Sequence, residues 1–379
     1  MQSFSNTSSS GLLQGTHRRC FTSSKCPQRP VLRLQSTAGQ PRQVAADAMV
    51  GCKLVGVGSS VPATVLSNTD MEKFVETNDD WIATRTGIKR RHILAEGETM
   101  AGHAAEACRK AMEMASVSAA DINMVIMATS TPDDAFGSAC QVQAALGAKN
   151  AVAFDLTAAC SGFVLALVTA AQFVRTGTAK HVLVVGADAM SRLVDWRDRG
   201  TCILFGDGCG AVVVTAAPDG ESCSLLGVDM HSDGNGQKSL HAMYSGCGGK
   251  PFQDADASRD ASYGNVHMAG QDVFKFAVRS VPSVIDAALK QAQLSTDDVD
   301  WLVMHQANQR ILDAAAQRLG LPAERVVSNL AEYGNTSAAS IPLALDEAVR
   351  AGKVKQGDVL AMAGFGAGLT WAGAIVRWG

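Results

Sequence analysis

An approximate internal repeat constrains the fold of this chain more than any other feature of its sequence. The apolar segment just before Ala128 reappears in similar form just before His305. Cys160 lies 32 positions after Ala128, and Asn335 lies 30 positions after His305. Two copies of one α/β unit would bring Cys160, His305 and Asn335 together across a pseudo-twofold axis, beyond the carboxyl ends of the strands. Loose self-similarity is common among α/β proteins, so the repeat alone leaves a fold without duplication open.

Strand-like and helix-like segments alternate along the body of the chain. Short apolar runs are separated by turns of small residues and by amphipathic helical patterns, which indicates the α/β class. The strands that we expect lie at 53–58, 123–127, 151–156, 181–185, 210–214, 299–304 and 325–328. The helices that we expect lie at 99–114, 139–146 and 163–174. The last of these helices carries no charge and is apolar nearly all round, which is typical of a buried helix.

Cys160 stands where the strand at 151–156 gives way to the helix at 163–174. A thiol at a helix start feels the partial positive charge of unpaired backbone N–H groups, which lowers its pKa and favours the thiolate. The same N–H groups can hold an oxyanion, and the small residues from Ala158 to Gly162 leave room for a substrate carbonyl. These properties indicate a nucleophile, although a buried free cysteine is more commonly inert.

Charge and composition argue against several other functions. The net charge of −3 gives no indication of binding to nucleic acid or to an anionic membrane. The longest charge-free apolar run in the body is shorter than the roughly 20 residues that a membrane span needs. The 10 cysteines show no CxxC or zinc-type spacing, and the glycine-rich turns lack P-loop and GxGxxG patterns. We therefore expect a soluble protein from a reducing compartment, without metal, flavin or nicotinamide.

The N-terminal segment from Met1 to Ala46 differs in kind from the rest. It contains no Asp or Glu, is rich in Ser, Thr and Gln, and carries scattered Arg and Lys residues. This composition is typical of an organellar transit peptide. A disordered basic tail is the alternative, and composition separates chloroplast from mitochondrial targeting poorly. The globular body is expected to begin near Val50.

Six motifs, in order along the chain, carry a specific family resemblance. They are Trp81-Ile82-Ala83-Thr84-Arg85-Thr86-Gly87-Ile88, the Cys160 turn, Phe205-Gly206-Asp207-Gly208, His305-Gln306-Ala307-Asn308, Gly334-Asn335-Thr336-Ser337-Ala338-Ala339-Ser340 and Gly366-Ala367-Gly368-Leu369-Thr370-Trp371. From about Val50 to its end, the chain resembles the β-ketoacyl-acyl-carrier-protein synthase III family. These are the initiating condensing enzymes of dissociated fatty-acid synthesis, in the thiolase-like superfamily.

The resemblance implies a thiolase-like, duplicated and layered αβαβα fold with two pseudo-twofold-related halves, assembled as a homodimer. The halves would span residues 50–222, with the nucleophile, and 223–379, with His305 and Asn335, after the transit peptide at 1–46. The implied reaction loads an acyl group, expected to be acetyl, from acyl-CoA onto the cysteine. Decarboxylative condensation with malonyl-acyl-carrier protein follows. In eukaryotes this synthesis is plastidial by implication, so we expect the chloroplast stroma.

The chemistry of this reaction suits the three converging residues. A thiolate at Cys160 can hold the first acyl group. His305, through a ring N–H, and Asn335, through its amide, are suited to donate to the malonyl thioester oxygen as carbon dioxide leaves. Taken singly, such a His is more often structural and such an Asn more often a turn residue. By resemblance, the backbone N–H groups of Cys160 and Ala367 hold the acyl oxyanion. Family members often have Gly at the second position, so Ala367 must not need a glycine-only conformation.

The resemblance also assigns residues to coenzyme A. It implies that Trp81 stacks on the adenine and that Arg199 lies on the other face of the base, with Thr77 and Arg85 nearby. The alternative for Trp81 is an ordinary aromatic residue of the core.

Acidic acyl-carrier protein is expected to meet a basic patch near the mouth of the site. Arg310 and Arg318 lie eight positions apart and therefore roughly on one helix face. The full set expected to contact the carrier protein is Gln306, Ala307, Asn308, Gln309, Arg310 and Arg318. Phe136 matches the family position that closes the acyl pocket of the partner subunit.

Two other functions fit parts of the same pattern. A related acyltransferase would use the same triad to move the acyl group of Cys160 to oxygen, nitrogen or a different carbon acid. A non-catalytic dimer partner that binds acyl chains would be expected to have a damaged triad, whereas Cys160, His305 and Asn335 are all present. The related acyltransferase stays open at the level of the sequence.

Overall fold

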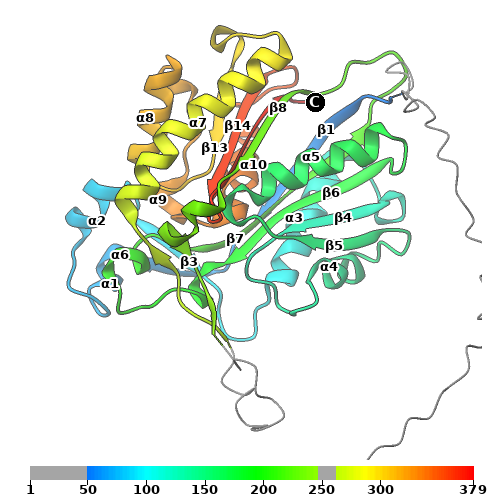
Figure 1. Cartoon of the computed structure of the whole chain (residues 1–379). Helices are drawn as coiled ribbons and strands as arrows, with labels where there is room; N and C mark the ends of the chain where they lie inside the picture. Colours follow the sequence, from blue (N-terminus) through cyan, green and yellow to red (C-terminus); the bar gives the residue numbers. More distant parts are fainter. Residues whose placement is uncertain (1–48, 246–261) are drawn as a thin grey trace, which may run out of the picture. The chain divides into compact units, whose positions relative to one another are not determined.

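The computed structural model of the chain describes residues 49–245 and 262–379. The predicted transit peptide, Met1 to Ala46, lies outside the described residues. Two large β-sheets and the helices that pack on them form the described body (Figure 1). The α/β class predicted from the sequence is confirmed.

The first large sheet has five strands in the order β1-β7-β6-β4-β5. Its strands are β1 (Cys52–Ser60), β4 (Met124–Ala128), β5 (Val152–Leu156), β6 (His181–Ala189) and β7 (Asp207–Ala216). β4 runs parallel to β5 and β6, whereas β7 pairs antiparallel with β6 and β1. The central strands are buried on both faces, which explains why they read as continuous apolar runs rather than as alternating patterns.

The second large sheet has four strands in the order β13-β14-β15-β8. Its strands are β8 (Leu225–Ser232), β13 (Trp301–Met304), β14 (Val359–Gly366) and β15 (Thr370–Arg377). β13 and β14 are parallel, and β15 pairs antiparallel with β14 and β8. The strands of the first sheet all come from residues before 217, and those of the second all come from residues after 224. Each sheet is thus built from one half of the sequence.

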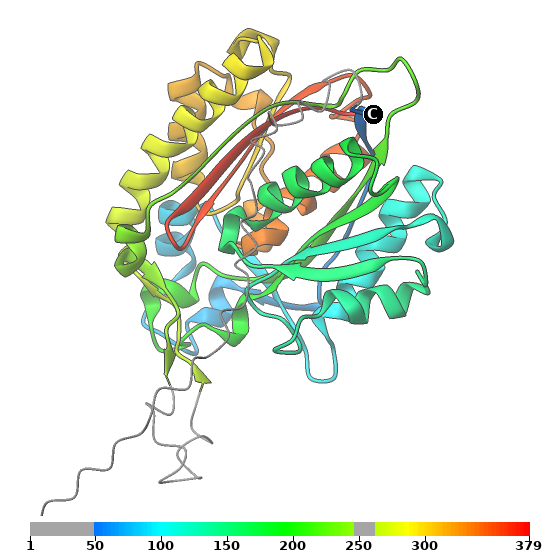
Figure 2. The same cartoon turned by 45° about the vertical axis from the view of Figure 1, so that its right-hand side comes forward.

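Helices separate the two sheets and cover their outer faces (Figures 1 and 2). They are α3 (Met100–Ala115), α4 (Ala139–Leu146), α5 (Gly162–Arg175), α7 (Gly270–Ala292), α8 (Gln309–Leu319) and α10 (Ser340–Arg350). α5 and α10 lie between the sheets, α3 and α4 lie on the outer face of the first sheet, and α7 and α8 lie on that of the second. This is the layered αβαβα arrangement predicted for the fold.

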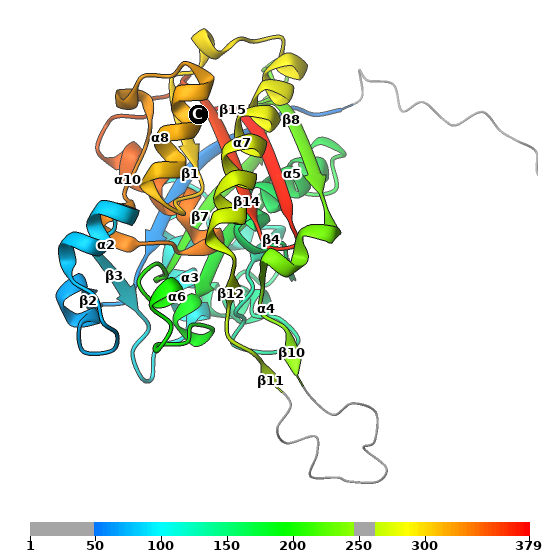
Figure 3. The same ribbon diagram turned by 60° about the vertical axis from the view of Figure 1, so that its left-hand side comes forward.

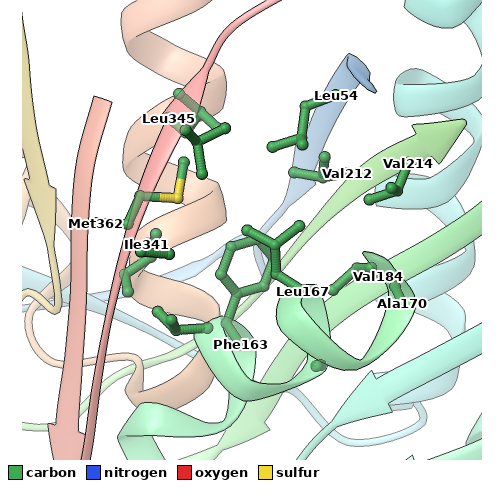
Figure 4. Packing of buried hydrophobic residues seen from close by; sticks show 14 of the residues in the cluster. Leu54, Phe163, Leu167, Ala170, Val184, Val212, Val214, Ile341, Leu345 and Met362 are labelled. Atoms are coloured by element: carbon green, nitrogen blue, oxygen red, sulfur yellow. The ribbon is translucent and has the colours of Figure 1, made fainter. Parts of the chain in front are cut away.

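Helix α5 fills the centre of the molecule. Figure 4 shows Phe163 and Leu167 of α5 among apolar side chains from β1, β6, β7, α10 and β14. A helix packed between two sheets buries most of its circumference, so it can be apolar nearly all round. The prediction of a buried helix at 163–174 is therefore confirmed. Packing of α5 against both sheets fixes the position of the turn that precedes it.

Shorter elements complete the described body (Figure 3). They are α1 (Asn68–Met71), α2 (Asp79–Thr86), α6 (Arg199–Cys202), α9 (Leu330–Tyr333), β2 (Thr64–Ser67), β3 (Arg90–Ile93), β9 (Leu240–His241), β10 (Tyr244–Ser245), β11 (Ser262–Tyr263) and β12 (His267–Met268). Within residues 49–245 and 262–379, no helix combines the length and the apolar character needed to cross a membrane.

The strand predicted at 325–328 is wrong. This segment makes a single isolated bridge, between Val326 and Leu302 of β13, and then leaves the sheet. The carbonyl of Val327 accepts a hydrogen bond from the side-chain amide of Gln306 (3.2 Å), and the backbone N–H of Asn329 donates to that amide (3.3 Å). A side chain therefore satisfies backbone groups that a neighbouring strand would otherwise pair, and the ladder stops.

Candidate active site

Cys160 occupies a tight turn between β5 and α5. It belongs to the 3₁₀ turn η3 (Ala159–Ser161), and only 8% of its surface is exposed. Ala159 has a left-handed φ of +47°, which is uncommon for a residue with a Cβ atom. The turn lies against the end of β14, where a Cβ added to Gly366 would come within 2.9 Å of the Cys160 nitrogen. This strained turn, which follows a strand of the first sheet, holds the thiol against β14 of the second sheet.

The second half of the chain has a matching turn. η9 (Ser337–Ala339) precedes α10 as η3 precedes α5, and its first residue, Ser337, has a φ of +50°. The two turns contact each other, and Asn335 lies just before η9. The repeat therefore brings corresponding turns together, as the sequence predicts.

A cavity of about 730 Å³ joins the three candidate catalytic residues. Cys160 from η3, His305 after β13 and Asn335 before η9 all line it. His305 is 1% exposed and Asn335 is 7% exposed, so all three side chains are shielded from bulk water. The structure thus brings together the residues that the sequence predicted to converge, while their catalytic roles stay a prediction.

His305 is held by several contacts. Its backbone N–H donates to the Ala363 carbonyl of β14 at 2.8 Å, and Phe365 packs edge-on against its ring with 5.1 Å between centroids. Nδ1 lies 2.7 Å from the Ser340 hydroxyl, which leaves Nε2 for the cavity. Burial lowers the pKa of His305 to about 3, against an opposing hydrogen bond to the Ser337 backbone. The imidazole is therefore uncharged at neutral pH.

The turn around Asn335 orients its side-chain amide. Oδ1 accepts a hydrogen bond from the backbone N–H of Ser337 at 2.9 Å, so the Nδ2 donor is left for the cavity. The backbone of Asn335 is tied to the first half of the chain through Leu204 (2.8 Å) and Gly206 (3.0 Å). Gly334, with a φ of +64°, lies so close that an added Cβ would come within 2.7 Å of the Leu204 carbonyl. The amide therefore presents a donor rather than an acceptor.

The thiol of Cys160 departs from the sequence-based expectation. Burial raises its pKa to about 12, and the charge of Asp188 acts in the same direction. A side-chain hydrogen bond with Ser337 and one with the backbone of Cys160 lower the pKa by less. The predicted lowering of the pKa at a helix start is therefore wrong, because the loss of water around sulfur outweighs the N–H groups of the turn. The thiol keeps its proton at neutral pH, and its reaction must include the loss of that proton.

The proposed second oxyanion donor, Ala367, follows β14 and lines the same cavity. Ala367 does not belong to the described residues with positive φ, whereas Gly368 has a φ of +126°. The conformation of Ala367 is thus one that alanine adopts without strain, and the departure from the family's glycine leaves its backbone donor available. Close approach is needed three residues earlier, within β14, since a Cβ on Gly364 would lie 2.8 Å from the Cα atom of Ser161.

The residues predicted to bind coenzyme A gather around α2. Trp81 lies between two arginines, with 4.4 Å from its ring centroid to the guanidinium carbon of Arg85 and 4.6 Å to that of Arg199. Arg199 also donates to the Glu76 carbonyl at 2.9 Å. The hydroxyl of Thr77 is buried and has no hydrogen-bond partner in the described structure. The slot predicted for adenine, between Trp81 and Arg199, is closed because the two side chains are in contact.

Gln306 is buried inside the fold. It is 1% exposed, and its Nε2 donates to the carbonyls of Met304 (2.7 Å) and Val327 (3.2 Å). Its side chain therefore points inward, and contact of Gln306 with a carrier protein stays a prediction. Asn308 has a different place, since it lines the cavity and its Nδ2 donates to the Arg85 carbonyl at 3.2 Å. Asn308 thus lies between the cavity and the Trp81 patch, which we define as Thr77, Trp81, Arg85 and Arg199.

Arg310 and Arg318 are both exposed on α8, but their guanidinium groups have different neighbours. Arg310 donates to the Thr84 carbonyl of α2 at 3.2 Å, whereas Arg318 donates to the Val278 carbonyl of α7 at 2.9 Å. Only Arg310 therefore lies beside the Trp81 patch.

Phe136, the residue assigned to the partner's acyl pocket, is fully exposed beside Ala135, which lines the cavity.

The residues that position the candidate catalytic side chains were not among those predicted from the sequence. Asp188, at the end of β6, is fully buried and accepts hydrogen bonds from the backbone of Ser130 (2.7 Å) and Ala338 (3.2 Å). It thereby ties η9 to the first sheet, and burial raises its pKa. Ser340 belongs to the motif around Asn335, so its hydroxyl was an available signal. Asp188 belongs to none of the six motifs, and only the fold reveals its place.

Comparisons with known proteins agree with this geometry. Two family models match: 3-oxoacyl-[acyl-carrier-protein] synthase III at residues 154–234, and the C-terminal part of the same synthase at residues 289–378. The β-ketoacyl-[acyl-carrier-protein] synthase III of Microcystis aeruginosa is 56% identical over 326 residues, covering 86% of this chain and 97% of that protein. The chloroplastic synthase III B of Cuphea wrightii is 57% identical over 336 residues, covering 87% and 83%.

Solved structures agree as well. The crystal structure of 3-oxoacyl-[acyl-carrier-protein] synthase III from Aquifex aeolicus VF5 has 44% sequence identity and a TM-score of 0.79, covering 86% of this chain and 100% of that one. The corresponding enzyme from Pseudomonas aeruginosa PAO1 has 40% identity, again with a TM-score of 0.79, and covers 86% and 98%. With the relatives above, these similarities establish that the chain belongs to the β-ketoacyl-acyl-carrier-protein synthase III family.

Proposed function

We propose that this enzyme loads an acyl group, acetyl by expectation, from acyl-CoA onto Cys160 and condenses it with malonyl-acyl-carrier protein. The products are 3-oxoacyl-acyl-carrier protein, coenzyme A and carbon dioxide, and the reaction initiates fatty-acid synthesis. The observation that carries the proposal is the convergence of Cys160, His305 and Asn335 on one shielded cavity. Family membership supports the overall reaction.

In the first half-reaction, the sulfur of Cys160 attacks the carbonyl carbon of acyl-CoA. The resulting oxyanion accepts hydrogen bonds from the backbone N–H groups of Cys160 and Ala367. The proton of the thiol leaves during the attack and ends on the departing sulfur of coenzyme A, so the acyl-enzyme carries no extra charge. His305 is a poor base for this step because the burial that lowers its pKa to about 3 disfavours an imidazolium.

In the second half-reaction, His305 and Asn335 bind the thioester oxygen of the malonyl group. Negative charge grows on this oxygen as the bond to carbon dioxide breaks, so both hydrogen bonds strengthen in the transition state. The enolate carbon then attacks the acyl group on Cys160 and expels the thiolate, which regains a proton. This role requires the tautomer of His305 that carries its proton on Nε2. The Ser340 hydroxyl lies 2.7 Å from Nδ1 and donates to the Ser337 carbonyl at 2.9 Å, so its proton must turn toward Nδ1 in that tautomer.

Coenzyme A is proposed to bind at the Trp81 patch, with its pantetheine arm passing Asn308 into the cavity. The two guanidinium groups supply positive charge for the phosphates, and the buried hydroxyl of Thr77 offers an unused hydrogen bond. Arg199 would have to leave the face of Trp81 so that adenine can enter between them.

Trp81→Ala is expected to raise the KM for acetyl-CoA about tenfold, because base stacking on an aromatic ring contributes about 1–3 kcal/mol. The kcat should change little, since Trp81 does not line the reacting cavity. Steady-state kinetics with acetyl-CoA varied at saturating malonyl-acyl-carrier protein measures both constants. Trp81→Phe, which keeps an aromatic face, should recover most of the loss. An unchanged KM in Trp81→Ala would contradict the assignment.

Carrier-protein docking and dimer formation are proposals with separate support. Arg310 is exposed on α8, the helix that follows His305, and lies beside the Trp81 patch, so it is the stronger of the two arginine candidates.

For the dimer, Phe136 is fully exposed and Val152, on the edge strand β5, is 55% exposed. An apolar edge strand of this kind is a surface that a second subunit would protect.

Residues 1–46 are proposed to direct import into the chloroplast stroma, leaving a mature enzyme with halves at 50–222 and 223–379. The acid-free composition and the chloroplastic and cyanobacterial relatives support this location. The N-terminal peptide of protein purified from chloroplasts should begin between Ser36 and Val50, as measured by mass spectrometry. Full-length protein in the cytosol, or the processed protein in mitochondria, would count against it.

Turnover of acetyl-CoA with malonyl-acyl-carrier protein tests the proposed function. Formation of 3-oxobutyryl-acyl-carrier protein with one carbon dioxide per turnover is the expected result. Transfer of the acetyl group to an alcohol or an amine, without release of carbon dioxide, would instead identify a related acyltransferase that uses the same triad.

A further inference from the structure

Cys52 and Cys223 form a thiol pair outside the active site. Their sulfur atoms lie 3.3 Å apart, and the backbone N–H of Cys52 donates to the sulfur of Cys223 at 3.4 Å. The backbone N–H of Ser224 donates to the Cys52 carbonyl at 2.6 Å. Standard bond lengths around this hydrogen bond keep the two Cα atoms within about 7 Å, the range that a disulfide spans. Joining the two sulfurs therefore needs no large backbone movement.

The pair connects the two halves of the fold at the end opposite the active site. Cys52 is the first residue of β1 in the first large sheet, and Cys223 lies in the segment that leads into β8 of the second. β1 runs parallel to β4 and β6, and β8 runs parallel to β13 and β14. Cys52 and Cys223 therefore lie at the amino ends of these strands, whereas the catalytic turns lie at the carboxyl ends.

The two thiols differ in exposure to solvent, and disulfide exchange needs one thiol that an oxidant can reach. Cys52 is fully buried, and Cys223 is partly exposed. The hydrogen bond between them lowers the pKa of Cys223 and raises that of Cys52. Because Cys223 is the accessible member of the pair, it is the thiol that meets an oxidant, and Cys52 is the resolving thiol beside it.

We propose that Cys52 and Cys223 are an oxidation site, at which an intrachain disulfide joins the two halves and stabilises the fold. With a small disulfide such as oxidised glutathione, the Cys223 thiolate attacks one sulfur and releases the first glutathione thiolate. Cys52 then gives up its proton and attacks the sulfur of Cys223, which releases the second glutathione. Two protein thiols are oxidised and one glutathione disulfide is reduced to two thiols.

The disulfide should increase the free energy of unfolding mainly by raising the free energy of the unfolded state. The two cysteines are 171 positions apart, so the bond closes a long loop in the unfolded state and removes much of its conformational freedom. Because the pair is distant from the cavity, the disulfide should leave the geometry of Cys160, His305 and Asn335 unchanged.

Incubation of the purified chain with oxidised glutathione tests this proposal. Remaining thiols are blocked with N-ethylmaleimide, and peptides are mapped by mass spectrometry without reduction. A linked pair of peptides containing Cys52 and Cys223 is expected, together with a rise in Tm of about 5 °C that dithiothreitol reverses. Cys223→Ser should show neither effect, whereas Cys140→Ser, which removes the exposed cysteine of α4, should show both.

The comparison of oxidised and reduced wild-type protein needs no variant, so poor folding of Cys223→Ser would not obscure the outcome. Cys223 that stays unmodified, or that stops at a mixed disulfide with glutathione, would overturn the proposed bond. A linked peptide pair without a rise in Tm would overturn its stabilising role.

Discussion

Cys160→Ser is expected to lose acyl-enzyme formation almost completely, with overall turnover falling by at least about 10⁴-fold, as when the nucleophile of a covalent enzyme is removed. A serine hydroxyl has a much higher pKa than a thiol, and the burial that already raises the pKa of Cys160 to about 12 would act on the hydroxyl as well. The turn would still place its N–H groups correctly, but no nucleophile of useful strength would remain.

Mass spectrometry of protein incubated with labelled acetyl-CoA measures this effect, since the label should appear on the peptide that contains Cys160. Cys140→Ser is the matched control, because Cys140 is exposed on α4 and should leave labelling intact. Normal transacylation by Cys160→Ser would remove Cys160 from the mechanism.

Substitution of His305 or Asn335 is expected to slow malonyl decarboxylation by about 10²–10³-fold, the usual cost of losing one preorganised donor to a developing oxyanion. Asn335→Asp is the sharpest variant, because its carboxylate can still accept the Ser337 N–H bond but offers no donor to the cavity. Release of labelled carbon dioxide from malonyl-acyl-carrier protein measures this step directly.

Two results would argue against the roles of His305 and Asn335 as hydrogen-bond donors in decarboxylation. Asn335→Asp with undiminished decarboxylation would show that the amide donor is not needed. A decarboxylation rate that titrated with a pKa near 6.5 would show that His305 ionises as if it were exposed, which its burial disfavours.

Part of the fold could be predicted because several strands and the buried helix α5 have a consistent local signal, whereas β8 and α7 were not predicted. The charge-free run at 163–174 became α5, and the apolar segments at 123–127 and 299–304 became β4 and β13, each within two residues at either end. The segment at 325–328 failed because its fate depends on the side chain of Gln306, which pairs with its backbone from another part of the chain. A strand pattern carries no information about such a distant partner.

In the candidate site too, some properties follow from the local sequence pattern and others depend on residues that only the fold brings near. The convergence of Cys160, His305 and Asn335 followed from the repeat, since matched turns of a duplicated unit meet. The protonation state of Cys160 did not follow, because the local pattern of a helix start indicates a low pKa while the surrounding fold removes water from the sulfur. The inward position of the Gln306 side chain did not follow for a related reason, since only the folded chain reveals the hydrogen bonds of its amide.

The acylation state of His305→Ala, measured by single turnover with labelled acetyl-CoA, distinguishes the two roles that His305 could have. If His305 binds the malonyl oxygen and does not take the proton of Cys160, labelled acetyl accumulates on Cys160 at a rate close to that of the wild type. Release of carbon dioxide from malonyl-acyl-carrier protein should nearly stop in the same variant. Loss of the acyl-enzyme with decarboxylation intact would contradict this assignment and would make His305 the general base for the thiol.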